Sequence, residues 1–182
     1  MEFAIVAFPV IECADLVASV RRRFDPLDGL LPPHVTIAFP FSEPGVEQTL
    51  ERHVADAIVG VSPFDIKLAR PTSAEDNYIF MELSEGADRF ALVHDRLYSG
   101  MLARHRSSAH GYRPHVTIGH LSQSEDVAAA TEHAADVLSR PLYGRVNAIA
   151  GFRLDYPWRG EVVFTLPLGE TPREVRQPGG ST

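Results

Sequence analysis

Cysteine, lysine and long apolar runs are scarce in this sequence of 182 residues. The one cysteine, Cys13, excludes an internal disulfide and any zinc site built from several cysteines, so we expect a reducing, cytoplasmic setting. No window approaches about 18 consecutive apolar residues, which excludes a transmembrane helix. The start has no basic segment before its apolar run, and we interpret it as a first strand, not a signal peptide. A lysine-nucleophile mechanism would depend on Lys67 alone.

The overall composition is that of a globular domain, with 45% hydrophobic and 23% charged residues. The net charge of -7 argues against a dedicated binder of long duplex DNA or RNA. We expect a monomer that associates with neither duplex DNA nor a membrane.

Strand and helix patterns alternate along the chain with short connections, which predicts one compact unit over residues 1–168 and a mobile tail over 169–182. Apolar residues at helical spacing predict helices near 13–24, 46–58, 90–101 and 122–139, the last with a capping box formed by Ser122 and Glu125. Arg21, Arg22 and Arg23 lie in the last turn of the first helix, where cations suit the helix dipole. Strands are predicted at 2–10, 34–40, 61–70, 77–84, 115–119, 142–154 and 160–168, the last two joined as a hairpin.

A five-residue repeat is the most informative feature of the sequence. Residues 33–37 read Pro-His-Val-Thr-Ile, residues 114–118 read the same, and a small residue follows each copy. Composition alone predicts roughly 0.01 such coincidences in a chain of this length. We therefore interpret the chain as a duplication of a unit of about 80 residues.

The period of a β-strand converts the repeat into a candidate site. Side chains alternate between faces, so His34 and Thr36 project together while their neighbours enter the core, and His115 and Thr117 do likewise. Two imidazoles on a shared site suit phosphoester transfer, because one can accept a proton while the other donates one. The threonine hydroxyls can donate to phosphoryl oxygens. A structural histidine and a strand-forming threonine are the ordinary interpretation of one copy, but not of two copies on equivalent faces.

Two such His-x-Thr motifs about 80 residues apart in an acidic chain resemble the two-histidine phosphoesterase superfamily, and most of all its 2'-5' RNA ligase and cyclic phosphodiesterase branch. The resemblance covers residues 1–168. It implies a bilobal α+β fold with pseudo-twofold symmetry, in which two antiparallel sheets face a central cleft and helices lie outside. Many bacterial members carry an arginine shortly after the second motif, where this chain has Gly119 and His120.

The resemblance also implies an activity, namely metal-independent hydrolysis of 2',3'-cyclic phosphates at RNA ends or in small cyclic nucleotides, giving 2'-phosphates. His34 and His115 would be the acid and base, and Thr36 and Thr117 would hold the phosphate. No cofactor is expected. Ligation of a 2'-5' linkage is the reverse chemistry at the same site, so the sequence leaves that alternative open. A non-catalytic nucleotide-binding module and a purely structural duplication are further alternatives, which the two intact motifs disfavour.

Several other residues are weaker candidates. Arg113 precedes His115 by two residues and is a candidate phosphate contact, because an acidic protein needs a local cation for an anionic substrate. Among the aromatic residues that could stack on a base, we favour Tyr112 and Trp158 because we expect both on loops. The remaining candidates for that role are Phe8, Phe41 and Tyr156.

The other histidines are expected to have no catalytic role. Histidines recur every five residues from His105 to His120, but that period matches one face of neither a helix nor a strand, which disfavours a metal site. Those within the predicted helices are expected at the surface: His53, His94 and His133.

Overall fold

The computed structural model describes residues 2–42, 45, 47–106, 111–155 and 159–169. Four helices lie within these residues: α1 Ala14–Phe24, α2 Glu47–Ala57, α3 Ala87–Leu97 and α4 Val127–Val137. The strands are β1 Glu2–Ala7, β2 Val10–Ile11, β3 Val35–Phe41, β4 Phe64–Leu68, β5 Thr72–Ser73, β6 Tyr78–Glu85, β7 His115–His120, β8 Leu142–Val146, β9 Ala148–Asp155 and β10 Arg159–Pro167. The α+β class is thus confirmed. None of the described helices has the length and apolar character needed to span a bilayer.

All strand pairs are antiparallel, and the strands follow one continuous order, β10-β9-β1-β3-β7-β6-β4-β8-β2, with β5 beside β6. The two facing sheets expected from the resemblance are joined through β6, which pairs with β7 on one edge and with β4 on the other. The strands β3 and β7, which carry the two motifs, lie at the middle of this order. The pairing of β9 with β10 confirms the predicted hairpin.

The centre of the sheet has the symmetry that a duplication requires. Val35 pairs with Val116, and these are equivalent residues of the two motifs. The outer neighbours follow the same pattern, since Ala7 of β1 pairs with Val35 and Met81 of β6 pairs with Val116. A local twofold axis therefore passes between β3 and β7.

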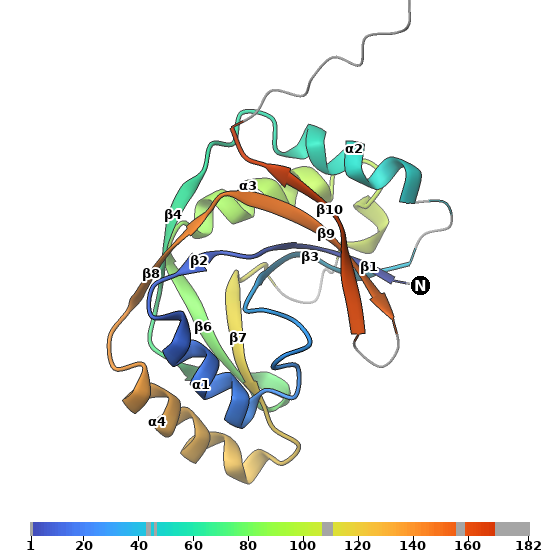
Figure 1. Cartoon of the computed structure of the whole chain (residues 1–182). Coiled ribbons are helices and arrows are strands. Elements are labelled where there is room, and N and C mark those ends of the chain that lie inside the picture. Colours follow the sequence, from blue (N-terminus) through green and yellow to red (C-terminus); the bar gives the residue numbers. More distant parts are fainter. Residues whose placement is uncertain (1, 43–44, 46, 107–110, 156–158, 170–182) are drawn as a thin grey trace, which may run out of the picture.

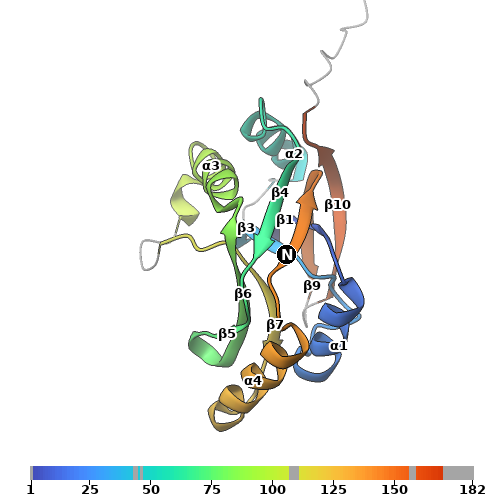
Figure 2. The same cartoon turned by 90° about the vertical axis from the view of Figure 1, so that its left-hand side faces the viewer.

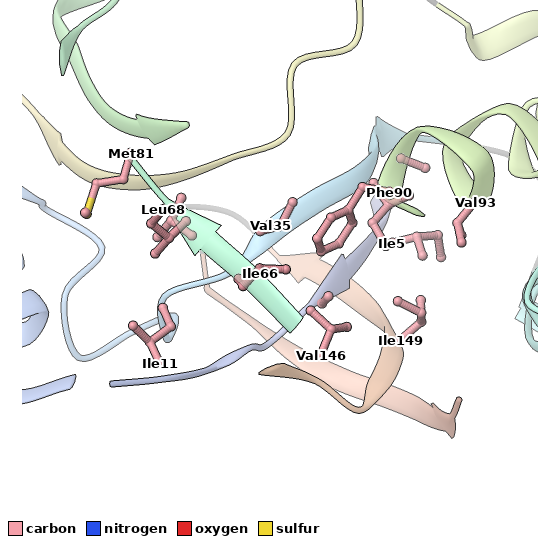
Figure 3. Close-up of a cluster of buried hydrophobic side chains, with 14 of the residues drawn as sticks. Ile5, Ile11, Val35, Ile66, Leu68, Met81, Phe90, Val93, Val146 and Ile149 are labelled. Carbon is pink, nitrogen blue, oxygen red and sulfur yellow. The ribbon is translucent and has the colours of Figure 1, made fainter. Parts of the chain in front are cut away.

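The helices form two pairs that contact the strands reciprocally. Figures 1 and 2 show α1 beside α4 at one end of the molecule and α2 beside α3 at the other. The helix α1 packs on β7, and α3 packs on β3, so each half covers the motif strand of the other half. Consequently the two halves share one apolar core, in which Val35, Met81 and Ile149 belong to a single cluster (Figure 3).

The small residues after the motifs have a packing reason. A register shift occurs on both sides, between Ile5 and Val6 against β3 and between Ile79 and Phe80 against β7. It places Ala38 opposite Ile5 and Gly119 opposite Ile79. A Cβ at Gly119 would lie 3.1 Å from both the Ile79 Cδ1 and the Phe24 Cβ, so a larger side chain would push into the core.

Three local predictions are wrong. The fourth helix begins at Val127 after a 3-10 turn at Ser124–Asp126, and its N-cap is Asp126, so Ser122 does not cap it. The strand expected at 142–154 is divided at Asn147 into β8 and β9, which pair with different strands. Leu16, one of the apolar residues whose spacing predicts the first helix, is exposed, whereas Arg21 of the same helix is buried.

Candidate active site

The strands β3 and β7 bring the two motifs to one face of the sheet. Val35, Ile37, Val116 and Ile118 are fully buried in the shared core. Because side chains alternate along a strand, the residues between them point to the opposite face. The half-buried side chains there form the candidate quartet: His34, Thr36, His115 and Thr117.

Both imidazoles are held in the same way. The Nδ1 of His34 lies 2.9 Å from the carbonyl oxygen of Pro32, and the Nδ1 of His115 lies 2.7 Å from that of Arg113. A carbonyl oxygen only accepts, so in each ring Nδ1–H donates to the backbone two residues earlier. Each neutral ring therefore keeps its proton on Nδ1 and leaves the lone pair of Nε2 free for a ligand.

The surroundings shift both imidazoles towards the neutral form. Burial lowers the pKa of His34 below its usual value, and the charges of Arg21 and His115 lower it further. The hydrogen bond to the Pro32 carbonyl and the charge of Asp25 raise this pKa, but the net shift is downward. Burial likewise lowers the pKa of His115, the bond to the Arg113 carbonyl and the Glu82 carboxylate raise it, and the Arg113 guanidinium lowers it. The charge of His115 is the smallest of the effects that shift the pKa of His34, and it lowers that pKa.

Apolar groups and a buried ion pair surround His34. The Phe8 ring lies 6.2 Å from the imidazole, at the edge of a second apolar cluster that includes Val6 and Leu31. Arg21 of α1 forms an ion pair with Asp25 at 2.8 Å, and both residues are buried. The segment after this pair leads directly to the histidine.

An aromatic row and an exposed ion pair surround His115. Its ring stacks on Phe80 with centroids 3.7 Å apart, and Phe80 stacks in turn on Tyr78 at 5.5 Å. Glu82 pairs with His115 across the strands and forms an ion pair with Arg113. A row of rings thus extends from His115 along β6.

The chain matches the model of the 2'-5' RNA ligase superfamily over residues 9–155. This chain belongs to the 2'-5' RNA ligase superfamily. The resemblance drawn from the two motifs is thereby confirmed.

Curated relatives and solved structures agree with this family assignment. A protein of Bacillus licheniformis named "putative phosphoesterase" is 32% identical over 122 residues, which are 65% of this chain and 70% of the relative. One of Geobacillus kaustophilus with the same description is 32% identical over 126 residues, 65% of this chain and 69% of the relative.

Among solved structures, TT0787 of Thermus thermophilus superposes with a TM-score of 0.63 at 17% identity, covering 92% of this chain and 98% of that one. LigT of E. coli superposes with a TM-score of 0.60 at 13% identity, covering 93% and 98%. These two likenesses concern the fold.

The weaker candidates occupy different places in this member of the superfamily. Arg113 is exposed beside His115 and engages Glu82, so its guanidinium lies at the edge of the quartet. Tyr112 is half-buried, its ring stacks on His94, and its hydroxyl donates to the Thr36 carbonyl. These contacts give Tyr112 a structural role, and its stacked ring does not present a free face to a base. Trp158 and Tyr156 lie outside the described residues. Phe41 is buried in the core, which removes it as a stacking surface.

The prediction for the helix histidines is wrong in one case. His94 is buried at 7% exposure, against Tyr112 and Tyr98, whereas His53 and His133 are half-buried. Of the five-residue series, His105 lies against Phe41, His115 against Phe80 and His120 against Tyr78. Within the described ranges, no group of three or more potential metal-ligating side chains gathers.

Residues near the quartet that the sequence interpretation missed come from β6 and α1. Phe80 and Glu82 alternate with the buried Ile79 and Met81, so the period of β6 contained a signal for their shared face. Arg21 and Asp25 have the four-residue spacing of a helical ion pair, but only the packing of α1 reveals that the pair is buried.

Proposed function

We propose that this protein is a metal-independent phosphoesterase that hydrolyses 2',3'-cyclic phosphates, at RNA ends or in small cyclic nucleotides, to 2'-phosphates. One observation carries the proposal: two imidazoles on one face each donate Nδ1–H to a backbone carbonyl, so that the lone pair of each neutral ring is on Nε2. Such a pair suits a reaction that needs one proton acceptor and one proton donor.

In the proposed mechanism, the Nε2 of the neutral imidazole removes a proton from water as its oxygen attacks phosphorus. The bond from phosphorus to the 3' oxygen breaks, and the protonated Nε2 of the other imidazole supplies the proton that this oxygen needs. The hydroxyls of Thr36 and Thr117 donate to the non-bridging oxygens, where charge increases in the transition state. The assignment of acid and base between His34 and His115 is left open.

The relatives support the substrate class. The superfamily is named after 2'-5' RNA ligase, and the curated relatives bear the name "putative phosphoesterase". LigT has been crystallised with 3'-AMP, NADP+ and ATP, which are all adenine nucleotides. Beside the quartet, Phe80 stacks on His115 and on Tyr78, and Tyr78 stacks on His120, so the rings of this row already contact one another and the histidines. Stacking of a base on Trp158 stays a prediction from the sequence.

The test is incubation of the purified protein with 2',3'-cyclic AMP and the other 2',3'-cyclic nucleotides, with and without EDTA. We expect the 2'-monophosphate, resolved from the 3' isomer by chromatography, at the same rate in both conditions. The His34→Ala variant is the control for a contaminating activity. Tight nucleotide binding without turnover would favour a binding module, and restoration of an EDTA-sensitive activity by Zn²⁺ or Mn²⁺ would contradict the proposed mechanism.

The length of the RNA is a second readout. With a net charge of -7, attraction for RNA must come from a few local contacts such as Arg113. We expect a dinucleotide with a cyclic phosphate end and a 20-mer to have similar kcat/KM, with a salt dependence equivalent to about one to three phosphates. A large advantage for the 20-mer would indicate an extended RNA-binding surface.

A further inference from the structure

One polar position is buried in each half of the duplication. The helices α1 and α3 both have 11 residues, and each leads to the segment before a motif. Counted from Ala14 and Ala87, the eighth residues are Arg21 and His94, which are 3% and 7% exposed. Together with Asp25, at 8%, they make up the buried polar and charged residues of the described ranges. Equivalent positions in a duplicated fold thus bury side chains of unlike chemistry.

In the first half, Arg21 connects α1 to the approach of His34. Its Nε donates to Asp25 at 2.8 Å, and a terminal guanidinium nitrogen donates to the carbonyl oxygen of Leu31 at 2.6 Å. Asp25 in turn accepts from the backbone N–H of Leu27 at 2.9 Å. Leu31 is three residues before His34, and the carbonyl that follows it, that of Pro32, is the one that holds the imidazole.

In the second half, His94 makes the equivalent connection by stacking. Its ring lies on that of Tyr112, with centroids 4.1 Å apart and an angle of 12° between the planes. Tyr112 is three residues before His115, and the next carbonyl, that of Arg113, is the one that holds the imidazole. The C-cap of α3, Tyr98, contacts the His94 ring at 4.8 Å, as the C-cap Asp25 contacts Arg21 in the first half.

The shared element is the contact, not the chemistry. A guanidinium and an imidazole both bind the residue three positions before a motif histidine. Immobilising that residue fixes the direction of the next carbonyl, and that carbonyl determines the tautomer and orientation of the ring. A role in stability alone would not require both side chains to contact the residue that lies three positions before a motif histidine.

We propose that Arg21 and His94 are positioning residues for His34 and His115, respectively, each acting through the carbonyl that binds Nδ1. The inference rests on the proposed function for its consequence in turnover, but the geometry it describes is independent of the substrate. A displaced imidazole lowers the rate of proton transfer, whereas the threonines that hold the phosphate remain in place. Loss of either residue therefore reduces kcat more than it changes KM.

The experiment measures kcat, KM and the tautomers of the two histidines, the last from imidazole 15N chemical shifts. In the first half the variants are Arg21→Met with Asp25→Leu, which leaves no buried charge, and Arg21→Lys, which keeps a cation beside Asp25 but lacks the planar fork that binds Leu31 as well. In the second half they are His94→Leu, which removes the flat ring, and His94→Phe, which retains it.

We expect the Arg21 variants to lower kcat by about 10- to 100-fold and to convert His34 from the Nδ1–H form to a mixture of tautomers, with His115 unchanged. His94→Leu has the converse effect on His115, and His94→Phe restores the wild-type values. If the double variant does not fold, kcat and the His34 tautomer are measured in Arg21→Lys instead, with the same expected changes.

Two results would overturn the proposal: folded variants with wild-type tautomers and kcat, or equal changes in both histidines from either substitution. The tautomer measurement needs no turnover. An inactive wild-type protein would therefore refute the proposed function while leaving the positioning proposal to be decided by the spectra.

Discussion

His34 and His115 are equivalent in the repeat, yet the side chains around them differ in kind. On the β3 side, defined by His34 and Thr36, the neighbours are the Phe8 ring and a buried Arg21–Asp25 pair. On the β7 side, defined by His115 and Thr117, they are the stacked Phe80 ring and the exposed ion pair of Arg113 with Glu82. The hydrogen bond from Nδ1 to the backbone is the same on both sides. The duplication has thus retained the orientation of each imidazole while its electrostatic surroundings diverged.

The largest expected effect tests whether the two sides are equally necessary. Replacing His34 or His115 with Ala should lower kcat by about 10²- to 10⁴-fold, because each removes one proton-transfer group. The double variant should lose less than the product of the two, since the rings act as one unit. Steady-state kinetics on a verified cyclic phosphate measure this. Near-normal turnover in either single variant would show that the two sides do not share one site.

The threonines compare the phosphate contacts of the two sides. Thr36→Val and Thr117→Val keep the strand-forming shape but remove the hydroxyl, and we expect kcat to decrease by about 10²-fold in each. Circular dichroism and thermal unfolding provide the control for folding. If one variant is fully active, the phosphate is held by the other side alone.

The pH dependence tests how the two imidazoles divide their tasks. Burial lowers the pKa of both rings below 6.5 in the free protein, and kcat/KM requires one ring neutral and the other protonated. We therefore expect a bell with its maximum below about pH 6.5 and a decrease of about tenfold per pH unit on the alkaline limb. The two limbs belong to the coupled pair. A maximum above pH 7.5, or a flat profile with chemistry rate-limiting, would contradict this division.

The Arg113 variant tests the exposed cation beside the quartet on the β7 side. Arg113→Gln should raise KM by about fivefold, because an exposed cation contributes about 1 kcal/mol to binding a phosphate. High salt should reduce the difference from wild type. Arg145→Gln is the matched control, since Arg145 is also exposed and paired with a carboxylate, that of Asp65 on β4. Equal effects of both substitutions would indicate a general loss of positive charge, not a contact at the site.

The smallest expected effect concerns stability at acidic pH. Burial lowers the pKa of His94 below 6.5, so the unfolded chain binds its proton more readily than the folded one. The stability contributed by neutral His94 is complete above pH 6.5 and is lost as the pH falls below that value. We expect the thermal stability of His94→Phe to depend less on pH between pH 7 and 5 than that of the wild type. The same pH sensitivity in the variant and the wild type would show that groups other than His94 cause the loss of stability at acidic pH.

Patterns of period and repetition were sufficient to predict the helices, most strands and the face of the quartet. Val35, Ile37 and their equivalents are buried as the alternation predicts, and the repeat identified β3 and β7 before their pairing was known. These features depend on the local chain, whose geometry is regular. The break at Asn147 was missed because β8 and β9 differ in their partners and not in their composition.

The supports of the site could not be derived in this way. A guanidinium in a last helical turn is ordinarily solvated, whereas that of Arg21 is buried and binds Asp25 and the Leu31 carbonyl. Tyr112 was predicted to face a base, but its hydroxyl and ring are engaged by Thr36, from 76 residues away, and by His94. Contacts between distant segments decide these roles, and no local pattern contains them.

The position of β1 in the sheet has a consequence for synthesis of the chain. Its two neighbours are β3 and β9, and β9 begins at Ala148. A ribosome releases the first, almost entirely apolar strand long before its second neighbour exists, so one edge of β1 stays unpaired while most of the polypeptide emerges. Synthesis of the β9–β10 hairpin therefore completes the pairing of β1. Nascent chains stalled before this hairpin would expose an unpaired edge of β1, to which chaperones or other nascent chains could bind.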